Sequence, residues 1–121
     1  MPAFIPDKAA IWFEIPVTDM ERSKAFYGAV LQNELMTEDS GPNPIAMFAA
    51  QNPAATGHIY PGKPAEPGTG GTIHLAVADL EAGLERVKAN GGEVVSPIVT
   101  IPSGRFAYCL DPDGNSFGLF K

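Results

Sequence analysis

The sequence predicts an α+β domain made of two βαβββ modules. Residues 12–31, WFEIPVTDMERSKAFYGAVL, recur in a weaker form at residues 72–91, TIHLAVADLEAGLERVKANG. In each copy an alternating apolar segment precedes an aspartate and a helical apolar pattern, and short strand-like segments separated by glycine and proline follow. A unit that occurs twice in this order indicates a duplicated supersecondary element.

Length and composition bound the organisation of the chain. At 121 residues it is expected to form one domain over residues 11–121, preceded by a tail at residues 1–10. Module 1 is expected at about 11–60 and module 2 at about 72–121. The segment between them, about 61–71, reads PGKPAEPGTGG and has the composition of a linker.

Several function classes are disfavoured by composition. No apolar run is long enough to cross a bilayer, and the N-terminus, MPAFIPDK, lacks the features of a signal peptide, so we expect a cytoplasmic protein without a membrane segment. The net charge is −6 and the basic residues are scattered, which disfavours nucleic-acid binding. Cys109 is the only cysteine, so no intrachain disulfide forms, and its apolar neighbours predict a buried structural thiol.

The opening strand is expected at residues 11–17. Trp12, Glu14 and Pro16 share one face of this alternating segment. The apolar residues of the opposite face are Phe13, Ile15 and Val17. Because Pro16 has no backbone N–H, the strand should lie at a sheet edge or leave the sheet there.

The first helix is expected to begin near Met20. Thr18 and Glu21 have the spacing of a capping box, and Asp19 is an alternative N-cap. The stripe predicted to pack on the sheet consists of Ser23, Phe26, Tyr27, Val30 and Leu31. Strands are then expected at 35–37, 45–50 and 57–60, separated by turns.

The second module repeats this plan. A strand at 72–77 leads to the N-cap Asp79 and to a helix that ends at Gly91 and Gly92. The buried face of that helix is expected to carry Leu80, Leu84 and Val87. Further strands are expected at 93–96, 99–101, 105–110 and 115–120, with a break at Pro97 and a tight DPDG turn at 111–114.

These motifs resemble the vicinal oxygen chelate superfamily, which includes glyoxalase I, bleomycin-resistance proteins and extradiol dioxygenases. They are the V-x-D segment and Phe26-Tyr27 of the first half, the VADL segment and double glycine of the second, and the terminal DPDGN hairpin. The resemblance implies a curled mixed sheet around a cavity and a homodimer. In catalytic members it also implies a divalent metal, held by the opening and last strands of each module.

The resemblance places the four metal ligands on positions that hold other residues. The opening-strand ligands fall on Trp12, whose indole cannot ligate a metal, and on Thr72, a poor neutral ligand. The last-strand ligands fall on Gly118 and near Gly57. We therefore expect no metal and no other cofactor. The two glycines leave room for a ligand or permit close packing of the sheet.

Glu14 and His74 are the candidate catalytic residues, because each lies five residues before the aspartate of its module. Each shares a strand face with the vacated ligand position, so both are expected to face the cavity. They could form an acid–base pair or a buried bridge between the modules. With His58 they could form a displaced metal site, although the strand parity of His58 relative to Gly57 favours an outward orientation.

The remaining ligand-binding candidates are Trp12 as a flat apolar wall, Tyr108 as a phenol donor, and Arg105 for an anionic group. Together with Glu14 and His74 they predict a metal-free protein that binds a small, partly apolar organic molecule. The alternative is a lyase, isomerase or dioxygenase that uses a displaced metal or the Glu14 and His74 pair. A third hypothesis is a partner-binding module with a vestigial cavity.

Overall fold

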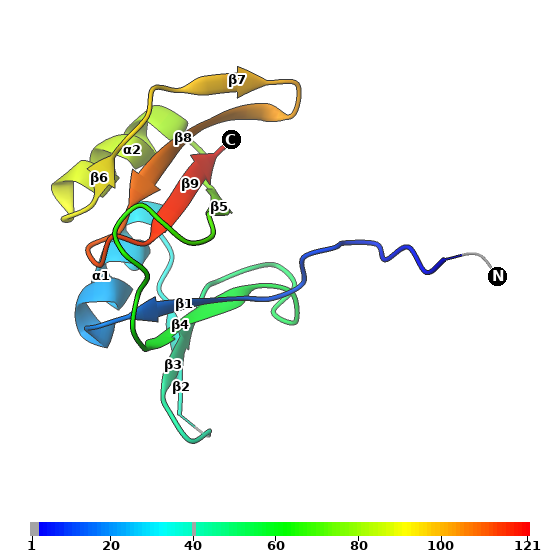
Figure 1. Ribbon diagram of the computed structural model, residues 1–121, viewed down its shortest axis with the longest axis vertical. Coiled ribbons are helices and arrows are strands. Elements are labelled where there is room, and N and C mark those ends of the chain that lie inside the picture. The colour runs from blue at the N-terminus through cyan, green and yellow to red at the C-terminus, as the bar shows by residue number, and fades with distance from the viewer. Residues whose placement is uncertain (1–2, 40) are drawn as a thin grey trace.

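Two βαβββ modules make up the fold in the computed structural model, which describes residues 3–39 and 41–121 (Figure 1). Module 1 contains β1 (Phe13–Val17), α1 (Met20–Leu31), β2 (Met36–Glu38), β3 (Ile45–Met47) and β4 (Gly57–Pro61). Its sheet has the order β1-β4-β3-β2, in which β1 and β4 are parallel and the other pairs are antiparallel. β1 is therefore an edge strand, as Pro16 predicted.

Module 2 has the same topology with one strand divided in two. It contains β5 (Ile73–Ala76), α2 (Leu80–Ala89), β6 (Glu93–Val94), β7 (Val99–Ile101), β8 (Gly104–Leu110) and β9 (Ser116–Phe120). The order is β5-β9-β8-β6, with β5 parallel to β9, and β7 pairs with the other end of β8. The predicted break at Pro97 lies between β6 and β7, so these two short strands together take the place of one strand of the βαβββ unit.

Both helices begin at an aspartate cap. The side chains of Asp19 and Asp79 accept hydrogen bonds of 3.0 Å from the N–H groups of Arg22 and Ala82, which satisfies otherwise unpaired donors of the first turn. Asp19 is thus the cap, and the alternative capping box at Thr18 does not form. Thr18 instead donates from its backbone and its hydroxyl to Asp113 of module 2.

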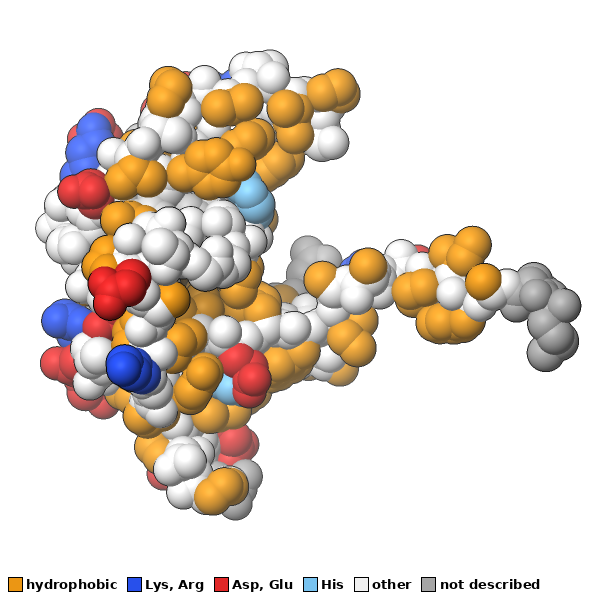
Figure 2. Space-filling model, viewed as in Figure 1, with side chains coloured by type: hydrophobic (Ala, Val, Ile, Leu, Met, Phe, Trp, Pro, Cys, Tyr) orange, Lys and Arg blue, Asp and Glu red, His pale blue; other side chains and the backbone are white. Residues whose placement is uncertain are grey.

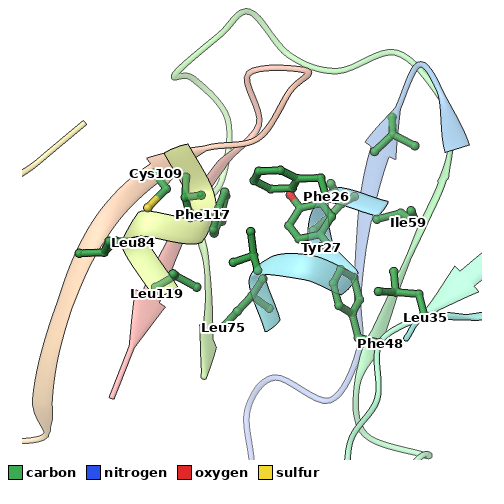
Figure 3. Close-up of a cluster of buried hydrophobic side chains, with 14 of the residues drawn as sticks. Phe26, Tyr27, Leu35, Phe48, Ile59, Leu75, Leu84, Cys109, Phe117 and Leu119 are labelled. Atoms are coloured by element: carbon green, nitrogen blue, oxygen red, sulfur yellow. The ribbon is translucent and has the colours of Figure 1, made fainter. Parts of the chain in front are cut away.

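One hydrophobic core joins the two modules. Figure 3 shows Phe26 and Tyr27 of α1 between Phe117 of module 2 and Ile59 of module 1. The predicted strand faces are confirmed, because Ile15 and Val17 are buried whereas Glu14 is exposed. The predicted helical faces are confirmed as well: the buried residues of the two helices are Ser23, Phe26, Tyr27 and Val30, and Leu80, Gly83, Leu84 and Val87.

The hairpin between β8 and β9 fixes module 2 against module 1. The buried carboxylate of Asp111 accepts a hydrogen bond of 2.6 Å from the hydroxyl of Tyr27. Asn115 donates 2.8 Å to the carbonyl of Pro16 and 3.0 Å to Asp111. Burial, followed by the charge of Asp111, raises the pKa of Tyr27 well above its usual value. The DPDGN segment is therefore more than a turn: it sets the position of one module relative to the other.

Cys109 is a buried structural thiol, as its apolar neighbours predicted. It lies fully buried in the core, and burial raises the pKa of its thiol to about 11. Neither helix of the described chain has the length and apolarity needed to cross a membrane.

Candidate functional site

The edge strands β1 and β5 border two shared cavities between the modules. One, of about 390 Å³, is lined by residues that include Trp12, Thr72 and His74. The second, of about 290 Å³, is lined by residues that include Glu14 and Thr72. We call these the inter-module cavities. A third cavity, of about 400 Å³, lies within module 1 beside Glu14, His58 and Tyr60.

Trp12, His58 and Glu14 form a continuous set of polar contacts on the cavity side of module 1. The indole Nε1–H of Trp12 donates to Nδ1 of His58 over 3.0 Å, and Nε2 of His58 lies 3.2 Å from Oε1 of Glu14. Because Nδ1 accepts, the neutral imidazole carries its proton on Nε2, facing the carboxylate. His58 is 8% exposed, whereas the Glu14 side chain is 63% exposed. A buried imidazole thus positions a carboxylate that solvent and ligands can reach.

The strand register explains this set and corrects two expectations. In the parallel pair of β1 and β4, Glu14 lies opposite His58, and paired residues share a face of the sheet. His58 therefore faces the same side as Glu14, and the expected outward orientation is wrong. In module 2 the equivalent pair is His74 opposite Gly118. By this internal symmetry the first-half equivalent of Gly118 is His58, not Gly57.

The two glycines are sites of close packing. A Cβ on Gly57 would lie 2.5 Å from the ring of Phe13, and a Cβ on Gly118 would overlap the imidazole of His74. The space that these glycines leave is therefore filled by neighbouring rings of the protein itself. Of the two interpretations, close packing of the sheet is the one observed.

His74 lies in an aromatic cluster rather than beside Glu14. Its ring centroid is 5.1 Å from that of Phe106, 5.8 Å from that of Tyr108 and 5.9 Å from that of Phe120. Among the described residues, no hydrogen bond or ion pair involves the imidazole of His74. The structure thus pairs Glu14 with His58. His74 and Tyr108, which is 39% exposed, present a separate aromatic wall.

Arg105 is directed away from this wall. Its guanidinium forms a two-point ion pair with Glu81 of α2, with N–O distances of 2.8 and 3.0 Å. This hydrogen bonding lowers the pKa of the Glu81 carboxyl to about 2. Along β8, Arg105 has the parity of the buried residues Ala107 and Cys109, whereas Tyr108 has the opposite parity. The structure therefore does not bring Arg105 together with the other predicted ligand-binding residues.

The residues at the implied metal positions do not fit a divalent ion. Trp12 offers no lone pair, and the hydroxyl of Thr72 is hydrogen-bonded to the hydroxyl of Ser116 at 2.7 Å. His58 uses Nδ1 to accept from Trp12 and directs Nε2 at Glu14, so no ring nitrogen is left for a metal. Within residues 3–39 and 41–121, no three His, Cys, Asp or Glu side chains are grouped so as to hold a metal ion.

The contact between Trp12 and His58 is the feature that sequence reasoning missed. Parity along one strand could not reveal it, because it depends on which residues of β4 lie opposite β1. A signal was nevertheless present: aligning the two halves through their last strands places His58 on Gly118.

Comparisons with known proteins agree with the fold. A sequence model of the Glyoxalase/Bleomycin resistance protein/Dioxygenase superfamily matches residues 10–119. A glyoxylase-like domain-containing protein of Didymella fabae is 30% identical over 114 residues, which cover 88% of this chain and 88% of that protein. CFP32 of Mycobacterium tuberculosis is 26% identical over 115 residues, which cover 91% of this chain and 44% of CFP32. The chain thus spans less than half the length of that relative.

A solved structure extends this agreement to three dimensions. The crystal structure of a glyoxalase/bleomycin resistance protein from Albidiferax ferrireducens superimposes with a TM-score of 0.73 and 26% identity, over 93% of this chain and 98% of that chain. The resemblance inferred from the duplicated motifs is thereby confirmed. The chain belongs to the glyoxalase/bleomycin resistance protein/dioxygenase superfamily.

Proposed function

We propose that this protein binds a small, partly apolar organic molecule at the inter-module cavities, and that it does so without a metal ion. The hydrogen bond from Trp12 to His58 carries this proposal. The indole N–H occupies the lone pair of His58 that a metal would need, and it supplies the positive end of a dipole in place of a cation. His58, which the internal symmetry aligns with the implied ligand position at Gly118, thereby supports Glu14 instead of a metal.

The residues that border the cavities indicate what such a molecule would look like. Trp12 and the ring of His74 offer flat apolar surfaces for an aromatic or aliphatic body. The exposed carboxylate of Glu14 accepts hydrogen bonds only, so it suits an ammonium or a hydroxyl group. A few convergent polar groups in a largely apolar site are typical of small-molecule binding.

Fluorescence provides a direct test, because Trp12 is the only tryptophan of the chain. Phenethylamine, phenethyl alcohol and 3-phenylpropionate share an aromatic body and differ in the charge of the head group. We expect a saturable change in Trp12 emission, with the tightest binding for the amine. Glu14→Gln should weaken binding of the amine and leave binding of the alcohol nearly unchanged. The control Glu85→Gln, on the exposed side of α2, should alter the binding of neither probe. The absence of saturation with all three probes would contradict the proposal.

A second candidate function is proton transfer, as in a lyase or an isomerase. It is favoured by the position of Glu14, a reachable carboxylate whose buried neighbour is an imidazole. A dioxygenase, by contrast, would need a metal ion that Trp12, Thr72 and His58 do not fit. Deuterium incorporation into hydroxyacetone, a small molecule with vicinal oxygens, can be followed by proton NMR in D2O. Exchange that depends on Glu14 and not on Glu85 would support catalysis, and exchange at the buffer rate would exclude it for this probe.

A further inference from the structure

The two inter-module cavities meet at Thr72 and Ile73, which line both of them. One cavity offers the apolar surface of Trp12, and the other offers the carboxylate of Glu14. Figure 2 shows the molecule hollowed between module 1 and module 2, with hydrophobic side chains bordering the hollow on both modules. A single ligand that extends from the apolar cavity to the carboxylate therefore passes the side chain of Thr72.

Thr72 and Ser116 form a pair of hydroxyl groups at this junction. Their oxygens lie 2.7 Å apart, and either one can be the donor. Thr72 is exposed and Ser116 is half-buried, so a ligand can reach the pair. Two hydroxyls carry two protons, and their mutual hydrogen bond uses one of them. Within the described chain neither hydroxyl makes another hydrogen bond, so one proton and several lone pairs are left for a ligand.

The linker, residues 61–71, forms another wall of the cavity that contains Glu14. Its residues 69–71 line this cavity, and the N–H of Gly68 holds it in place by donating to the carbonyl of Gly114 over 3.0 Å. The hydroxyl of Thr69 donates to the carbonyl of Glu66 over 2.6 Å. This third hydroxyl of the cavity is thus committed to the linker itself, and the proton available to a ligand comes from the pair at the junction.

A ligand hydroxyl suits this pair better than a carbonyl does. A hydroxyl can accept the remaining proton and donate to a lone pair at the same time, whereas a carbonyl can only accept. The pair lies between an apolar surface on one side and a carboxylate on the other. The complementary molecule therefore carries, in this order, an apolar body, a hydroxyl group and a cationic head group.

We infer that the ligand class is a small amino alcohol whose hydroxyl group lies between an apolar body and an ammonium group. This inference rests on the proposed binding of a partly apolar molecule at these cavities, and it specifies that molecule. The body lies against Trp12, the hydroxyl bonds to Thr72 and Ser116, and the ammonium pairs with Glu14. Trp12 and Glu14 are two residues apart in an extended segment, which separates them by about 6.6 Å. An ammonium that is two carbons away from an apolar ring has a similar reach.

Titrations that follow Trp12 emission test this inference with phenethylamine and the two enantiomers of 2-amino-1-phenylethanol. The three amines share the ring and the ammonium and differ in the hydroxyl. Because three separate contacts fix the handedness of the carbon that bears the hydroxyl, one enantiomer should bind about 3- to 10-fold more tightly than phenethylamine, as one neutral hydrogen bond allows. The other enantiomer should bind no more tightly than phenethylamine.

The outcomes separate this inference from the proposed function. Saturable binding of phenethylamine together with equal affinities for both enantiomers would overturn the inference and leave the proposed function intact. The absence of saturation with all three amines would contradict both.

The double variant Thr72→Val/Ser116→Ala assigns the preference to the hydroxyl pair. It removes both hydroxyls, so the favoured enantiomer should bind like phenethylamine, whose own affinity should stay nearly unchanged. The control is Thr100→Val, an exposed threonine of β7 outside the lining of both cavities, and it should keep the full preference. A double variant that keeps the preference, or one that weakens all three amines equally, as a merely structural pair would, overturns the inference.

Discussion

Tyr27→Phe should destabilise the protein by removing one hydrogen bond between the modules. The hydroxyl of Tyr27 is fully buried and donates to the carboxylate of Asp111 over 2.6 Å. A hydrogen bond to a charged acceptor contributes about 1.5–3 kcal/mol to stability. For a chain of 121 residues the unfolding entropy is about 0.25 kcal/mol/K, so Tm should fall by roughly 6–12 °C.

The effect of Tyr27→Phe should also depend on pH. The pKa of Tyr27 is raised in the folded state by burial and by Asp111. Above the ordinary tyrosine pKa of about 10, the unfolded chain therefore loses this proton while the folded chain keeps it. The contribution of Tyr27 to stability is thus complete below pH 10 and declines above it. The difference in the free energy of unfolding between natural protein and variant should shrink accordingly.

Denaturant unfolding at pH 7 and at pH 10.5 measures both effects. Tyr108→Phe is the matched control, because the hydroxyl of Tyr108 makes no hydrogen bond to another described residue and its side chain is partly exposed. We expect this control to change stability by less than about 0.5 kcal/mol. A loss in Tyr27→Phe no larger than that of the control, or a loss that is equal at the two pH values, would refute the role given to the Asp111 hairpin.

Three other predictions concern the two faces of module 2. Gly118→Ala should displace the imidazole of His74, weaken probe binding and destabilise the protein. Adding His74→Ala to this variant should recover most of the lost stability. Additive effects of the two substitutions on stability would contradict a clash between the Cβ of residue 118 and the imidazole of His74. Arg105→Gln should return the carboxyl pKa of Glu81 from about 2 towards 4.5, which carbon-13 NMR can measure, while probe binding stays unchanged. Weaker probe binding by this variant would show that Arg105 contributes to the binding site after all. Cys109 should react with a thiol reagent only when the chain unfolds, and rapid labelling of the native protein would contradict its burial.

The architecture could be predicted from local patterns. Aspartate caps, strand alternation and glycine stops are determined by neighbours within a few residues, so both helices and the faces of β1 and β5 followed from the sequence. The duplication added the order of the elements. Even the division of one strand at Pro97 followed from a local rule.

The partners of the site residues could not be predicted in the same way. Whether Glu14 meets His58 or His74 depends on the register of β1 and β4, and residues 44 positions apart in the chain set that register. The hydrogen bond between Asp111 and Tyr27 could not be predicted from local sequence, because Tyr27 belongs to the other module. Arg105 was predicted to bind an anionic group of the ligand. Its position along β8 and its ion pair with Glu81 instead direct it towards α2.

Metal analysis of the purified protein tests the central claim most directly. The natural protein and Trp12→His are each incubated with zinc, nickel, manganese or ferrous iron, dialysed, and analysed by mass spectrometry of the elements. We expect the natural protein to retain far less than one ion per chain, because the indole of Trp12 occupies the lone pair of His58. Trp12→His, which frees His58 and adds an imidazole near Glu14, should retain more. One tightly held ion per chain in the natural protein would contradict the claim.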